Sequence, residues 1–108
     1  MTSFDDREKA YEKKFAHDAE LKFKASARRN KLLGLWAAEK MGMTGDDVEH
    51  YAKGVVLADL EEPGDEDVLR KVRSDFDDAG IDQSDHQIRR TMEELMDEAV
   101  AQIEGARD

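Results

Sequence analysis

Cysteine is absent from this sequence of 108 residues, and its only proline is Pro63. The lack of cysteine excludes disulfides and thiolate chemistry and is typical of a reducing compartment. Long apolar runs are also missing: no stretch approaches the ~20 residues of a membrane-spanning helix. The first twenty residues carry ten charges, unlike the apolar core of a signal peptide. We therefore expect a cytoplasmic protein that does not insert into a membrane.

Charge, by contrast, is abundant and unevenly distributed. Acidic residues outnumber basic ones by 27 to 17, and the net charge is −10. Residues 1–40 nevertheless carry a net charge of +3, against −13 for residues 41–108. An acidic protein repels a phosphate backbone, so we expect no nucleic-acid partner. We expect the basic side chains of residues 21–40 to pair with the acidic second half. They are Lys22, Lys24, Arg28, Arg29, Lys31 and Lys40.

Apolar residues recur at spacings of three and four, which predicts helices, and no run alternates with the period of a strand. The first helical segment is predicted over residues 3–41 and ends before Gly42. A variant of the capping box, from Thr44 to Asp47, opens the second helix. That helix ends near residues 61–62, because Pro63 cannot continue it.

Two more helices are predicted beyond the proline. The third begins at Asp65, where acidic residues favour a helix N-terminus, and closes at Gly80. The fourth opens with a capping box formed by Ser84 and Gln87. Short connections predict antiparallel neighbours, so the expected fold is all-α, a four-helix bundle. The predicted core consists of Leu21, Ala25, Leu32, Leu35, Trp36, Val48, Tyr51, Ala52, Val55, Val56, Val68, Leu69, Val72, Phe76, Ala79, Ile88, Met92, Leu95, Met96, Ala99 and Ile103.

No motif for catalysis or metal binding is present. His17, His50 and His86 stand too far apart in the sequence to form a metal-binding pair. Residues 75–80 match only part of a calcium loop, since a histidine occupies the place of its bidentate glutamate. Neither a glycine-rich phosphate loop nor a nucleophile elbow occurs. We expect a protein that is not an enzyme and that uses no cofactor and no metal.

The first eighteen residues carry an apolar stripe that the bundle cannot fully cover. Phe4, Tyr11 and Phe15 are spaced so that they share one face of a helix. A continuous helix over residues 3–41 would be about 58 Å long, roughly twice the length of the fourth helix. The aromatics either complete the bundle core, belong to a disordered terminus, or bind a groove of a partner protein.

Several segments together are distinctive of one family. They are Phe4-Asp5-Asp6-Arg7-Glu8, Lys14-Phe15-Ala16-His17-Asp18, the run RRNKLLGLWAAE from Arg28 to Glu39, Gly45-Asp46-Asp47, Tyr51-Ala52, Gly64-Asp65-Glu66-Asp67-Val68 and Asp85-His86-Gln87-Ile88-Arg89-Arg90. Over essentially its whole length, the chain resembles the zeta subunit of alphaproteobacterial F1Fo-ATP synthases, an inhibitor of their ATPase activity.

The resemblance implies a four-helix domain at residues 19–108 and a mobile N-terminal helical segment, residues 1–18, which is flexible when free. In the family, this segment inserts between the α and β subunits at a catalytic interface, next to the γ stalk, and blocks ATP hydrolysis. The resemblance also implies a monomer that is held at the inner membrane only through the ATP synthase. The partner-binding residues it implies are Phe4, Arg7, Glu8, Tyr11, Lys14, Phe15 and Asp18.

Two other functions stay open at this point. The chain would be a constitutive helical adaptor if the bundle, and not residues 1–18, binds another cytosolic complex. It would be a nucleotide-sensing bundle if Arg28, Arg29 and Lys31 bind phosphate groups.

Overall fold

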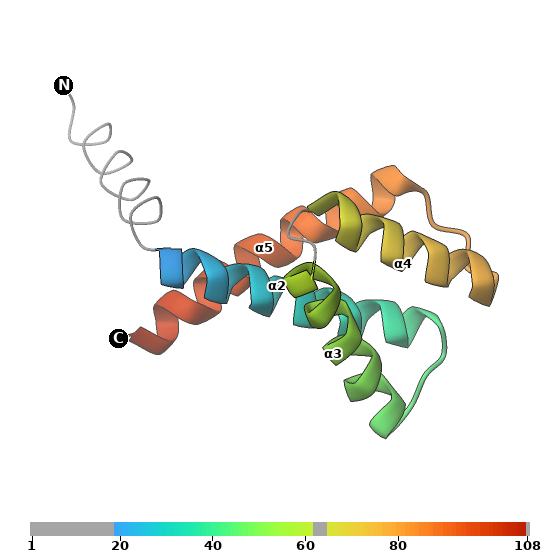
Figure 1. The fold of residues 1–108 in the computed structure, drawn as a ribbon, viewed down its shortest axis with the longest axis horizontal. Helices are drawn as coiled ribbons and strands as arrows, with labels where there is room; N and C mark the ends of the chain where they lie inside the picture. The colour runs from blue at the N-terminus through green and yellow to red at the C-terminus, as the bar shows by residue number, and fades with distance from the viewer. Residues whose placement is uncertain (1–18, 62–64, 108) are drawn as a thin grey trace.

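The computed structural model describes residues 19–61 and 65–107, which form four helices joined by short connections (Figure 1). The helices are α2 (Ala19–Lys40), α3 (Asp46–Glu61), α4 (Asp65–Ala79) and α5 (Asp85–Arg107). Because these ranges contain no strand, the predicted all-α, four-helix fold is confirmed. No helix in this part of the chain has the length and apolarity needed to cross a membrane. Residues 3–18 of the first predicted helical segment lie outside the described residues.

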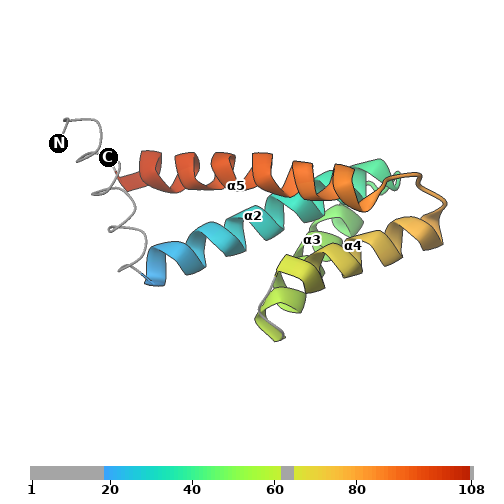
Figure 2. The same ribbon diagram turned by 90° about the horizontal axis from the view of Figure 1, so that it is seen from above.

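The molecule is elongated, measuring 52 × 27 × 23 Å. α2 and α5 run side by side and extend together past α3 and α4, at the end where α2 begins and α5 ends (Figures 1 and 2). We call this end, residues 19–28 and 99–107, the arm. α3 and α4 pack at the opposite end, against the second half of α2 and the first half of α5 (Figure 1).

The core lies where all four helices meet. Phe76 is fully buried there, and its ring contacts that of Trp36 edge to face, with 5.5 Å between the ring centroids. α2 and α3 approach closely at Gly34, where a Cβ atom would stand only 2.5 Å from the Cα of Ala52. The buried cluster comprises Leu33, Ala37, Val55, Val68, Leu69, Val72, Phe76, Ile88 and Met92.

The predicted core face of α2 is partly wrong. Leu21 and Ala25 are buried as predicted, and the partly buried Trp36 packs against the core cluster, but Leu32 and Leu35 are only partly buried and do not belong to it. Gly34, at the close contact with α3, lies on the face of α2 that turns inward. The residues buried there instead are Leu33, Ala37 and Ala38.

Two glycines end helices as predicted. Gly42 and Gly80 have positive φ values of 77° and 72°, a conformation that costs glycine little. The N–H group after each glycine donates to a carbonyl in the last turn, over 3.0 Å to Ala38 and 2.8 Å to Phe76, which satisfies carbonyls that lack a helical partner. Ala79, predicted to be buried, is exposed because it lies at this helix end.

One of the two predicted capping boxes is confirmed. The Ser84 N–H donates to Gln87 Oε1 over 2.8 Å, and the Gln87 N–H donates to Ser84 Oγ over 3.1 Å. The prediction that Thr44 caps α3 is wrong. The helix begins at Asp46, directly after Gly45, whose φ of 63° turns the chain into the first helical turn.

Candidate functional site

The partner-binding residues predicted from the sequence all precede Ala19. Phe4, Arg7, Glu8, Tyr11, Lys14, Phe15 and Asp18 therefore lie outside the described residues, and their roles stay predictions. The structure does place the residue to which that segment is joined. α2 begins at the tip of the arm, away from the four-helix core, whose cluster and its partly buried neighbours are built from residues 33–95 (Figures 1 and 2).

A shallow groove of about 700 Å³ starts next to that point and follows the arm. Its walls come from α2, α3 and α5, so it exists only in the folded molecule. Phe23, which also lines it, is 57% exposed, more than any other large apolar side chain in the described part of the chain. We call it the arm groove. It is lined by the apolar residues Leu21, Phe23, Ala27, Val56 and Ile103, by the cations Lys24, Arg28 and Lys31, and by Glu20 and Gln102.

The cations of the arm groove differ in how they are paired. Lys24 lies 3.3 Å from Glu20 one turn earlier on the same helix. The Arg28 guanidinium donates to Oε1 of Gln102 over 3.3 Å, a neutral partner. Neither Arg28 nor Lys31 forms an ion pair with any residue in the described ranges. The expected pairing of the basic residues of α2 with the acidic second half is therefore wrong for both.

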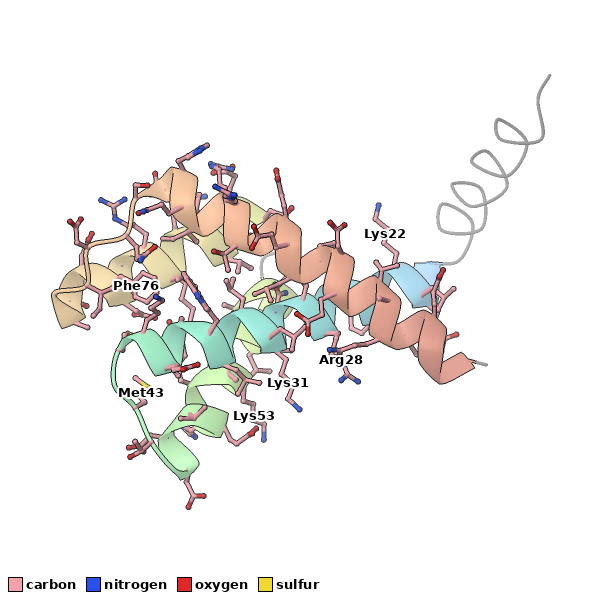
Figure 3. The ribbon with its side chains drawn as sticks, turned by 180° about the vertical axis from the view of Figure 1, so that it is seen from behind. Lys22, Arg28, Lys31, Met43, Lys53 and Phe76 are labelled. Carbon is pink, nitrogen blue, oxygen red and sulfur yellow. The ribbon has the colours of Figure 1, made fainter. Side chains whose placement is uncertain are left out.

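These cations also share one side of the molecule. Arg28, Lys31 and Lys53 project from the same side, whereas Lys22 points to the opposite side (Figure 3). Lys53 lines a second hollow, of about 530 Å³, to which Lys31 also contributes. The second hollow is also lined by two acidic residues of α3, Asp46 and Glu49, so the excess of cations is confined to the arm groove.

Arg29 was expected on the same basic face, and the structure buries it instead, with 3% of its surface exposed. Its Nε donates to Asn30 Oδ1 over 2.7 Å, and its terminal nitrogen donates to Asp65 Oδ1 over 2.8 Å. This pair ties the start of α4 to the middle of α2. Asn30 is fully buried, and its Nδ2 has no hydrogen-bond partner. From the sequence, the burial of Asn30 could have been predicted only from its spacing, since it stands three residues before Leu33, which is also buried.

Two further polar contacts join neighbouring helices. Tyr51 on α3 donates to Asp75 Oδ2 on α4 over 2.7 Å. Burial, together with this hydrogen bond, raises the pKa of Tyr51, so its hydroxyl stays protonated. Between α4 and α5, the hydrogen bond from the Arg89 guanidinium lowers the pKa of the Glu66 carboxyl group. No cluster of metal-ligating side chains occurs among residues 19–61 and 65–107.

Comparison with known proteins gives a match over nearly the whole chain. A family model described as ATPase inhibitor subunit zeta matches residues 1–102. A protein whose structure was determined by NMR in solution is 48% identical and aligns with a TM-score of 0.70, covering 80% of this chain and 98% of that chain. No curated protein matches.

Proposed function

The chain belongs to the ATPase inhibitor subunit zeta family, and from this premise we propose that it inhibits ATP hydrolysis by the F1Fo-ATP synthase through residues 1–18. One observation carries the proposal: the matched region includes the N-terminal segment with its aromatic stripe as well as the four helices. The protein then binds the F1 part of the complex and is held at the inner membrane only through it.

In this proposal, residues 1–18 form a helix at an interface between an α and a β subunit, next to the γ stalk. A helix wedged there blocks rotation in the hydrolysing direction. The three aromatic side chains supply most of the affinity, since anchors of this kind contribute about 2 kcal/mol or more each. The charged residues of the same helical face fix register and speed the encounter. The face comprises Phe4, Arg7, Glu8, Tyr11, Lys14, Phe15 and Asp18.

The arrangement of the described helices supports this division of labour. α2 begins at the tip of the arm, and the buried cluster draws on residues 33–92. A segment attached before Ala19 therefore engages a partner without the core having to open. Inhibition and folding should accordingly respond to different substitutions.

The test is ATP hydrolysis by a purified alphaproteobacterial F1-ATPase, titrated with the full chain and with a chain lacking residues 1–18. We expect inhibition by the full chain only. Phe15→Ala should raise the half-inhibitory concentration about 30-fold, which corresponds to roughly 2 kcal/mol of lost binding. Its melting temperature should match that of the parent protein.

Asp6→Ala serves as the matched control, because Asp6 lies on the opposite face of the same helix. It should inhibit nearly as well as the parent. If the shortened chain inhibits as strongly as the full one, the bundle binds the partner, and the adaptor function replaces the proposed one. If Phe15→Ala lowers the melting temperature and the inhibition together, Phe15 belongs to the core.

A further inference from the structure

Cations in the described part of the chain fall into two groups. Those of α4 and of the first half of α5 each form an ion pair; they are Arg70, Lys71, Arg73, Arg89 and Arg90. Arg28, Lys31 and Lys53, on the side of the arm groove, form none with a described residue, and neither do Lys22 and Lys40, although the chain carries 27 acidic residues against 17 basic ones. Three of these cations lie together beside an apolar groove, where they are available to pair with carboxylates of another molecule.

Exposed apolar surface accompanies these cations. Among the described residues, the exposed large apolar side chains are Phe23, 57% exposed, and Leu57, 49% exposed. Phe23 lines the arm groove with Arg28 and Lys31, whereas Leu57 is not among the residues that line it. An apolar centre with charges around it is the usual composition of a protein-binding surface, since aromatic anchors give affinity and the charged rim gives specificity.

We propose that the arm groove binds an acidic amphipathic helix of the F1 complex. Its carboxylates pair with Arg28 and Lys31, and its apolar face covers Phe23. This inference rests on the proposed function, because the groove begins at Glu20, two residues after the segment that we propose to be inhibitory, residues 1–18. On the F1 complex, the surface that binds residues 1–18 then adjoins the surface that binds the arm. This second contact would fix the direction in which the segment enters its interface.

Two other occupants fit the groove less well. Residues 1–18 carry four basic and five acidic residues, which offers little complementarity to a basic groove. They would also have to reverse direction at the first turn of α2 in order to reach it. A second copy of the chain brings a net charge of −10 to a molecule of the same charge, so the two copies repel each other.

The test compares Lys31→Glu with Lys22→Glu in the full-length chain. Both lysines are exposed on α2, neither forms an ion pair with a described residue, and both substitutions change the net charge equally. Only Lys31 lines the groove, and Lys22 points to the opposite side (Figure 3). We expect Lys31→Glu to raise the half-inhibitory concentration against F1-ATPase about tenfold more than Lys22→Glu at low salt. The difference should shrink at high salt, where surface charges are screened.

Equal effects of the two variants, with inhibition by the parent chain intact, would overturn this inference and leave the proposed function standing. Absence of inhibition by the parent chain would overturn both. A photo-reactive residue in place of Phe23 identifies the occupant in the inhibited complex. A cross-link to an acidic helix of an F1 subunit supports the inference, whereas a cross-link to residues 1–18 or to a second copy of the chain overturns it.

Discussion

The two ends of this molecule are built differently. Where the four helices meet, nine apolar residues between Leu33 and Met92 are buried in one cluster. In the arm only α2 and α5 continue, and the buried apolar residues there are Leu21, Ala25 and Ala99. Stabilisation by apolar burial scales with the area removed from water, and alanine contributes little area. The core end therefore supplies most of the stability.

The arm, in turn, carries the features to which we assign the recognition of a partner. It presents the exposed aromatic side chain of Phe23 and the guanidinium of Arg28, which forms no ion pair with a described residue, and α2 begins at its tip. In this view α2 and α5 contribute to stability at the core end and to partner binding in the arm. Substitutions at the core end should change the free energy of unfolding, and substitutions in the arm should change binding.

The largest effect is expected at Phe76, which is fully buried in the four-helix core. Phe76→Ala should lower the free energy of unfolding by about 4 kcal/mol, because it removes apolar contacts and leaves a cavity beside Trp36. Urea denaturation followed by circular dichroism measures the change. Phe23→Ala is the matched substitution in the arm and should stay within about 0.5 kcal/mol of the parent protein. Similar losses for both would show that the arm is part of the core.

A second pair of substitutions tests the contact between α2 and α3. A Cβ atom at Gly34 would stand 2.5 Å from the backbone of Ala52, so Gly34→Ala must push the helices apart. We expect a loss of about 3 kcal/mol from this overpacking. Gly54→Ala is the control, because the nearest atom to its Cβ is 4.0 Å away, at the end of the Lys71 side chain. There the better helix propensity of alanine should stabilise the protein by about 0.5–1 kcal/mol.

At the boundary between the two ends, Arg29 joins α2 to α4. Arg29→Ala removes the ion pair with Asp65 and leaves the buried Oδ1 of Asn30 without its donor. We expect a loss of about 2 kcal/mol, since one partner of this pair is exposed and the other buried. Arg28→Ala, one residue earlier and exposed, should leave stability within about 0.5 kcal/mol of the parent. A larger loss for Arg28→Ala would give the arm groove a structural role.

The sequence predicts the helices and most of their ends because these depend on neighbouring residues. Gly42, Gly80 and the Ser84–Gln87 box act within one or two turns, so their effect can be read from the local pattern. Thr44 failed as a cap because the glycine after it can adopt a positive φ and begin the helix one residue later. Local competition of this kind is decided by small energy differences.

The inward face of α2 and the arm groove could not be predicted in the same way. Arg29 is an ordinary surface residue by type, and its burial follows from tertiary contacts, among them the ion pair with Asp65 at the start of α4. The arm groove needs Val56 and Ile103 to lie beside α2, which only the tertiary structure decides. The candidate residues between Phe4 and Asp18 were proposed from their helical spacing and from the family resemblance, and they stay predictions.

The smallest effect is expected at the ion pair between Glu66 and Arg89, which links α4 to α5 at the core end with 2.7 Å between the charged atoms. The hydrogen bond from Arg89 lowers the pKa of Glu66 from its usual 4.5. A lowered carboxyl pKa in the folded state stabilises the protein above the unfolded pKa, and that contribution is lost as the pH falls through the folded pKa. Glu66→Gln should therefore lower the melting temperature slightly at neutral pH and leave it unchanged well below 4.5. Glu93→Gln, at an exposed carboxylate in the interior of α5 without an ion pair to a described residue, should show no such dependence. A deficit of Glu66→Gln that persists in acid would mean that the side chain acts through packing and not through its charge.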